Sequence, residues 1–70
     1  MKTFGERLRQ LRNFRGIGQV ALAKAIGVSK AIVSLWENNL REPTVSNLRA
    51  LVLFFNESAD YLIGVADLSE

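Results

Sequence analysis

The chain has no cysteine and no histidine, and only one proline and one methionine among its 70 residues. Without cysteine it can form neither a disulfide bond nor a thiolate metal site. Without histidine it lacks the usual general base of enzymes and the commonest side-chain metal ligand. Catalysis would have to rely on serine, lysine, tyrosine and carboxylates alone. We therefore expect neither an enzyme nor a bound metal, cofactor or small-molecule ligand.

Long apolar runs are also missing. No stretch approaches the roughly 20 apolar residues that are needed to cross a bilayer. The N-terminal sequence MKTFGERLRQ carries charges from its start and has no apolar core of a signal peptide. Since 70 residues suffice for one small hydrophobic core, we expect a single domain in the cytoplasm, with no membrane partner.

Charge is distributed unevenly along the chain. Residues 1–49 hold nine basic and three acidic residues, a formal charge of +6, whereas residues 50–70 hold four acids and no base. Such a division predicts one pole of the molecule that attracts a polyanion and one that does not. The alternative is an uneven distribution without functional meaning.

Hydrophobic periodicity is helical throughout, and no strand pattern is present. The fold class is therefore all-α. Serine or threonine is placed to begin three of the helices and glycine or asparagine to end all five. We predict helices at about residues 3–14, 19–26, 30–38, 45–55 and 59–63.

Residues 19–35 contain the most informative pattern. Two helices of about eight residues are joined by a turn of three or four residues that contains Gly27. Glycine allows the chain to reverse in the left-handed conformation, and the small Ala23 lies where the two helices would cross. This spacing is typical of a helix-turn-helix, in which the second helix enters the DNA major groove. An ordinary helical hairpin without a role in DNA binding is the alternative.

Five segments, FGERLRQLR, GIGQVALAKAIGVS, WENN, REPTVSNL and SADYLIG, together resemble the XRE family of helix-turn-helix domains, which includes phage Cro and repressor proteins. The resemblance implies a compact five-helix domain, at residues 1–65, followed by a short tail at 66–70. It also implies a sequence-specific transcriptional regulator that binds double-stranded operator DNA as a homodimer. A repressor of phage or bacterial origin is the simplest form.

The resemblance further implies the residues of the site. Those expected to face base edges are Ser29, Lys30, Ala31, Ser34 and Leu35. Those expected at DNA phosphates are Gln19, Asn38 and Arg41, and Gln19 is also expected to brace the recognition helix. Arg12 and Glu37 match a structural ion pair between the first helix and the end of the third; contact of Arg12 with a phosphate is the alternative. Lys24 and the arginines of the first helix would add positive field without direct contact; for Lys24 and Arg41 a merely solvated face is the alternative.

Three positions depart from the family pattern: Gly18 and Val20 replace polar residues around the start of the second helix, and Leu35 stands where a polar or basic residue is usual. Leu35 and the neighbouring Ala31 could pack on thymine methyl groups in the major groove. They could instead bind another protein, which would make the chain an interaction module such as an antirepressor or one part of a two-protein regulatory system. A tolerated exposed leucine is the third alternative. A nonspecific nucleoid-type DNA binder is disfavoured by the modest net charge of +2.

Leu53 lies on the predicted outer side of the fourth helix, about 140° from the core residue Leu48 at 100° per residue. It would form an apolar patch on the pole away from DNA with Leu40, Ala59, Val65 and Leu68. A two-fold dimer with Leu53, Glu57 and Ala59 at its interface would set two recognition helices about 34 Å apart, one turn of DNA.

Overall fold

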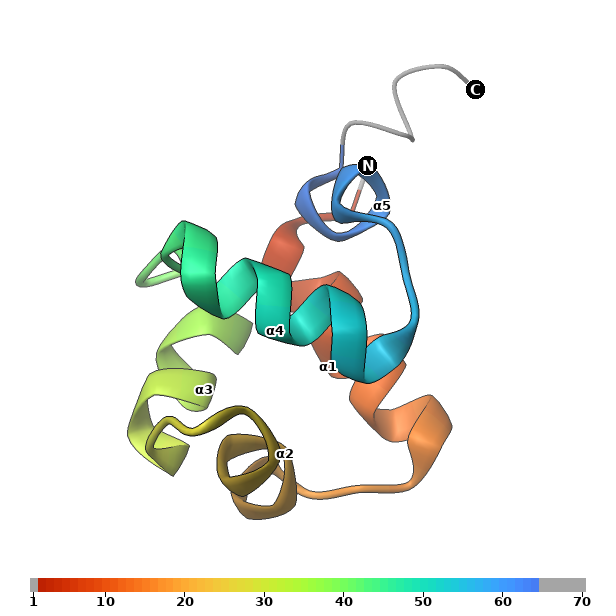
Figure 1. Ribbon diagram of the computed structural model, residues 1–70. Helices are drawn as coiled ribbons and strands as arrows, with labels where there is room; N and C mark the ends of the chain where they lie inside the picture. The colour runs from red at the N-terminus through yellow and green to blue at the C-terminus, as the bar shows by residue number, and fades with distance from the viewer. Residues whose placement is uncertain (1, 65–70) are drawn as a thin grey trace.

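The computed structural model describes residues 2–64, in which five α-helices and no strand are found (Figure 1). The helices are α1 (Phe4–Arg15), α2 (Gln19–Ile26), α3 (Lys30–Glu37), α4 (Val45–Phe55) and α5 (Ala59–Ile63). The predicted all-α class is confirmed, and each helix begins and ends within one residue of its predicted bounds. The tail predicted at 66–70, with the apolar residues Val65 and Leu68, lies outside the described residues.

Local sequence sets the ends of the helices. Thr3 accepts a hydrogen bond from the backbone amide of Glu6, and the Glu6 carboxylate accepts one from the amide of Thr3, so α1 begins with a capping box. Hydroxyl groups also cap the starts of three later helices, those of Ser29, Thr44 and Ser58. The backbone is left-handed at each of the predicted helix stops, which are Gly16, Gly27, Asn39, Asn56 and Gly64.

One apolar core lies between the helices. Trp36 is its largest buried side chain, and the ring of Phe4 packs edge-on against it at a centroid distance of 6.4 Å. The helix α3 packs against α1 and α2, while α5 packs against α1 and α4. In Figure 1, α4 crosses the front of the molecule and α5 lies at the end away from α2. The buried apolar residues are Leu8, Leu22, Ala23, Val33, Trp36, Leu51, Phe55 and Leu62.

Within residues 2–64, no single helix is both long and apolar enough to span a membrane. Only α2 and α3 together reach that length and apolar composition, and they are bent relative to each other by 111°.

Arg7 is buried, which corrects the expectation that the arginines of the first helix all add charge to the surface. The residue is only 2% exposed, and its guanidinium carbon lies 4.6 Å from the centre of the Tyr61 ring. A guanidinium over an aromatic face is a stabilising cation–π contact, stronger when it is shielded from water. Arg7 therefore joins α1 to α5.

The start of α1 lies directly against the end of α3. The backbone amide of Gly5 donates to Asn39 Oδ1 at 3.0 Å, and Asn39 Nδ2 donates to Thr3 Oγ1 at 3.0 Å. A Cβ atom on Gly5 would lie 2.6 Å from the carbonyl oxygens of both Trp36 and Glu37. Only glycine fits this close approach, so Gly5 helps to fix α3 in place.

We expect Gly5→Ala to lower the free energy of unfolding by about 1–3 kcal/mol, because two backbone carbonyls must move to admit the methyl group. This cost outweighs the gain of about 1 kcal/mol that alanine brings to a helix interior. Urea unfolding followed by circular dichroism measures it. Gly18→Ser is the control, since a Cβ there meets no atom within 4 Å. A Gly5→Ala variant as stable as the parent would contradict the clash.

Candidate nucleic-acid interface

The helices α2 and α3 form a bent pair at the surface. They are joined by residues 27–29, and their 111° bend lies within the 90–120° that is typical of a helix-turn-helix. The amides of Gly27 and Val28 both donate to the carbonyl oxygen of Ala23, at 2.9 and 3.0 Å, which closes the turn. Ala23 itself is buried, as expected for the position where the two helices cross.

The outer side of α3 is one continuous face. At 100° per residue, its exposed and half-buried residues from Lys30 to Leu35 fall within an arc of about 200°, with the half-buried Ile32 at one edge. The buried residues Val33, Trp36 and Glu37 occupy the other side. Of the five positions predicted to face base edges, four are on this outer face: Lys30 and Ala31 are exposed, and Ser34 and Leu35 are half-buried. The fifth, Ser29, is exposed and caps the start of the helix.

Leu35 corrects one alternative drawn from the sequence. It is half-buried and not a freely exposed leucine. It lies at the edge of the outer face, and the chain after α3 folds back so that the amide of Leu40 donates to the carbonyl oxygen of Leu35 at 2.9 Å. Ile32, the next residue around the helix, is also half-buried.

Polar groups on the outer face are partly engaged within the chain. Ser29 Oγ accepts from the amide of Ile32 at 3.2 Å, which leaves its hydroxyl hydrogen to donate. Asn38 Nδ2 donates to the carbonyl oxygen of Ser34 at 2.8 Å and to Ser34 Oγ at 3.4 Å, which leaves its Oδ1 to accept. Both side chains are thus held in place while they keep hydrogen-bonding capacity for a ligand.

The carboxylate of Glu37 is the most heavily bonded group near this face. The residue is 3% exposed. Arg12 binds both of its oxygens, with Nε 2.7 Å from Oε2 and Nη2 2.9 Å from Oε1, and its Nη1 donates to the carbonyl oxygen of Ile17 at 3.0 Å. Gln19 Nε2 donates to Oε1 at 3.0 Å. Arg9 adds an ion pair, its Nε lying 3.5 Å from Oε1, and its Nη2 donates to the Glu37 carbonyl oxygen at 3.4 Å.

These contacts keep Glu37 ionised. Burial by itself would raise its pKa, but the hydrogen bonds from Arg12 and Gln19, the charge of Arg12 and the hydrogen bond from Arg9 outweigh burial, so the pKa lies below its ordinary value. The same pairing raises the pKa of Arg12. An ionised carboxylate is therefore fixed at the junction of α1, α2 and α3.

Arg9 was not assigned a specific contact from the sequence, although a signal was present. Arg9 and Arg12 are three residues apart and share a face of α1, so a partner of one is within reach of the other. Gln19 was expected both to brace the recognition helix and to touch a phosphate. The structure shows it bound to the last residue of α3.

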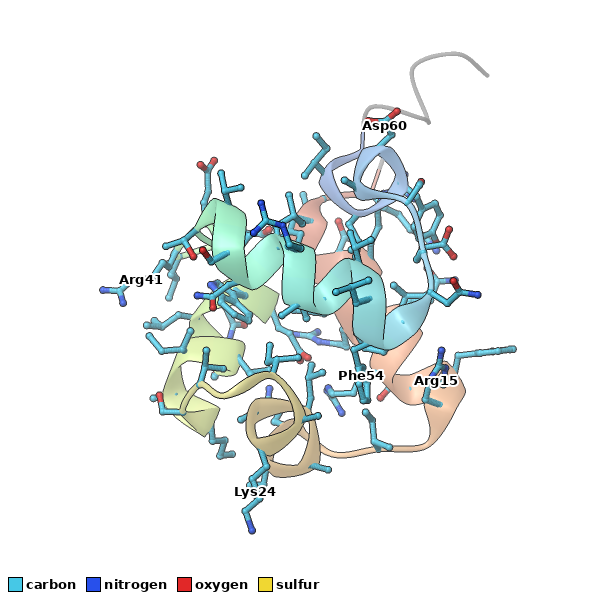
Figure 2. All side chains as sticks on the ribbon, viewed as in Figure 1. Arg15, Lys24, Arg41, Phe54 and Asp60 are labelled. Carbon is cyan, nitrogen blue, oxygen red and sulfur yellow. The ribbon has the colours of Figure 1, made fainter. Side chains whose placement is uncertain are left out.

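Positive charge on the side of α3 comes from fewer residues than the sequence total indicates. In Figure 2, Arg41 and Lys24 extend outward near the two ends of the surface that carries α3, and Asp60 lies at the other end of the molecule. Arg15 is on another side, where it donates to the Phe55 carbonyl oxygen at 3.0 Å. Arg7, Arg9 and Arg12 are buried or paired. The exposed bases on the α2–α3 surface are thus Lys24, Lys30 and the nearby Arg41.

Comparison with known proteins matches residues 8–62 to the helix-turn-helix family. The transcriptional regulator PrpR of Mycobacterium tuberculosis is 46% identical over 76 residues, which span 99% of this chain and 16% of PrpR. Repressor protein C2 of Salmonella phage P22 is 44% identical over 66 residues, which span 94% of this chain and 30% of the repressor. The chain therefore corresponds to less than a third of the length of either relative.

The fold is shared with a solved protein–DNA complex. The crystal structure of the P22 c2 repressor with a synthetic operator superposes with a TM-score of 0.86 at 41% identity, and the match covers 90% of this chain and 96% of that one.

The lowered pKa of Glu37 predicts acid sensitivity. Its contribution to stability is complete above the ordinary glutamate pKa of 4.5 and is lost as the pH falls through the lower pKa of the folded state. We expect Glu37→Gln to lower the free energy of unfolding by about 3–5 kcal/mol at neutral pH, because Arg12 loses its buried partner. The variant should also lose less stability than the parent chain as the pH falls. Denaturant unfolding between pH 7 and 3 measures both effects. Glu42→Gln, which removes an exposed carboxylate, is the control and should lose as much stability in acid as the parent chain.

Proposed function

The chain belongs to the helix-turn-helix family, and we propose that it is the sequence-specific, double-stranded-DNA-binding domain of a transcriptional regulator. One observation carries the proposal: a repressor with the same fold is bound to its operator. We propose that the domain occupies residues 1–65 and acts in the cytoplasm as a repressor, by covering an operator and excluding polymerase.

Base recognition is assigned to the outer face of α3. Lys30 begins the helix, and the N-terminal residues of a recognition helix are those that contact base edges. Its ammonium group can donate to guanine O6 and N7, and Ala31 and Leu35 can pack on thymine methyl groups. The half-burial of Leu35 supports an apolar contact, because little of its surface would remain in water once a base edge covers it. The hydroxyls of Ser29 and Ser34 complete this surface.

Phosphate contacts are assigned to groups on both sides of that face. Gln19 lies at the start of α2, while Asn38 and Arg41 follow α3. Contacts of this kind fix the register of the protein on the duplex, and each neutralised phosphate makes binding more sensitive to salt. We expect Arg41→Ala to weaken binding to all sequences and to reduce the salt slope by about one.

A homodimer is proposed across α4 and α5. An almost entirely apolar groove of about 250 Å³ lies there, lined by Val45, Leu48, Arg49, Val52 and Ala59. Val45 is 73% exposed and Leu53, on the neighbouring flank of α4, is 74% exposed. Covering such a surface with a second copy would remove apolar area from water. With Leu53, Glu57 and Ala59 at the interface, the two recognition helices would lie about one DNA turn apart.

Leu40 does not belong to this surface as the sequence suggested. It lines a separate depression with Phe4, Asn39, Arg41, Glu42 and Ile63, because the loop after α3 carries it toward the start of α1.

Selection of random duplexes at a single salt concentration tests sequence recognition. We expect a pseudo-palindrome with half-sites about one turn apart. Lys30→Ala should weaken binding to the selected site by roughly 5- to 150-fold, the equivalent of 1–3 kcal/mol, and relax preference at one base pair. Lys24→Ala removes the same charge from α2 and should reduce binding to all sequences slightly and equally. Failure to enrich any sequence would direct attention to a protein partner for α3.

The thymine contact of Leu35 has its own test. Replacing selected thymines by deoxyuridine removes only the methyl group, and we expect a loss of roughly fourfold per contacted methyl, about 0.8 kcal/mol. Leu35→Gln should lose this discrimination at the thymine that Leu35 contacts and keep any that is due to Ala31. If the parent chain does not distinguish the two duplexes, Leu35 is not a methyl reader.

Sedimentation equilibrium, with and without operator, tests the dimer. We expect Val45→Asp to shift the chain toward monomer, because the new carboxylate would be buried in an apolar interface. Phe14→Asp is the matched control: Phe14 is 87% exposed on α1, and its substitution should leave association unchanged. A parent chain that is monomeric at high micromolar concentration, both alone and on DNA, would contradict the dimer.

A further inference from the structure

Gln19 can present two opposite chemical faces to a phosphate. Its amide group carries a donor, Nε2, and an acceptor, Oε1. A phosphate oxygen only accepts hydrogen bonds, so Nε2 directed at it attracts and Oε1 directed at it repels. The orientation of this amide therefore decides whether Gln19 helps or hinders DNA binding.

The structure shows what sets that orientation. Gln19 Nε2 donates to Glu37 Oε1 at 3.0 Å. An ionised carboxylate accepts hydrogen bonds and cannot donate one, so reversal of the amide would bring two oxygens together beside a buried negative charge. One hydrogen of Nε2 is bonded to Glu37. The second hydrogen of the same nitrogen can donate to another group.

The carboxylate cannot turn away, because Arg12 binds both of its oxygens at 2.7 and 2.9 Å. Arg9 approaches the oxygen that Gln19 uses, at 3.5 Å. The position of Glu37 Oε1, and with it the position of the Gln19 amide, is thus set by two arginines of α1.

The start of α2 beside Gln19 is open. Gly18 provides no side-chain cap, in contrast to the hydroxyl caps of α1, α3, α4 and α5. The first amides of a helix have no partner within the helix and favour a negative charge. A phosphate placed there would meet both these amides and the second hydrogen of Gln19 Nε2.

We propose that Glu37 is a positioning residue for phosphate binding: its carboxylate holds the Gln19 amide in the one orientation that presents an N–H to the DNA backbone. The inference rests on the proposed function. It assigns to the buried ion pair a role in DNA binding beyond holding the fold together. A glutamine at position 37 would accept either orientation of Gln19, since its own amide can donate as well as accept.

A double-mutant cycle in operator affinity tests this role. With Glu37 present, Gln19→Ala should weaken binding roughly tenfold, as expected for loss of a hydrogen bond to a charged group. In the Glu37→Gln background the same substitution should weaken binding by at most about twofold. Arg41→Ala is the matched control, because it removes another proposed phosphate contact and should cost the same factor in both backgrounds. Equal losses for Gln19→Ala in the two backgrounds would overturn the inference.

A rescue separates orientation from stability. Lysine at position 19 has donors and no acceptor, so Gln19→Lys should restore more affinity in the Glu37→Gln background than it adds when Glu37 is present. No restoration of affinity by lysine in the Glu37→Gln background would overturn the inference. All affinities are measured at a temperature at which denaturant titration shows each variant to be folded.

Should Glu37→Gln not fold, the parent chain gives the answer by nuclear magnetic resonance. The Nε2 proton of Gln19 that bonds to Glu37 should exchange with water more slowly than the other one, and operator binding should shift the other proton strongly while the bonded one changes little. Equally fast exchange of the two protons in the free protein, or no shift on binding, would overturn the inference alone. A parent chain that binds no duplex DNA would overturn the proposed function as well.

Discussion

The buried carboxylate of Glu37 joins three helices at a single point. An isolated helix of eight residues is not stable in water, so the orientation of α3 depends on what holds it. Trp36 and Val33 anchor one side by burial, and Glu37 anchors the end through Arg12 and Gln19. Apolar packing alone tolerates small rotations of a helix, whereas a bidentate ion pair fixes the direction of the contact as well as its distance.

The surface offered by α3 follows from that anchoring. Once Val33, Trp36 and Glu37 face inward, helical geometry leaves Lys30, Ala31, Ser34, Leu35 and Asn38 on the outside. The charge available to a polyanion is reduced, because Glu37 neutralises one of the two arginines, Arg9 and Arg12, that bind it. Recognition by such a surface depends on the shape and placement of a few side chains more than on net charge. This is the requirement for reading sequence as opposed to binding any nucleic acid.

A second surface, across α4 and α5, has the opposite character. Its groove is apolar, and large side chains on α4 are exposed beside it. Small proteins cannot bury every apolar group, but exposed apolar residues gathered around a groove favour this surface for the proposed dimer. A domain that binds DNA with one face and a second copy with another can match the two-fold symmetry of an operator.

The sequence by itself determined the five helices, their ends and the helix-turn-helix spacing. Caps such as Ser29 and stops such as Gly27 act within a few residues, so they can be read directly from the chain. The ion pair of Arg12 and Glu37 was also predicted, but only through family resemblance. Tertiary structure alone decided that Arg7 is buried, that Leu35 is half-buried, and that Arg9 and Gln19 meet at Glu37. The contacts of Arg7, Arg9 and Gln19 join residues 18 to 54 positions apart. Local preferences carry no information about which distant groups the packed helices will bring together.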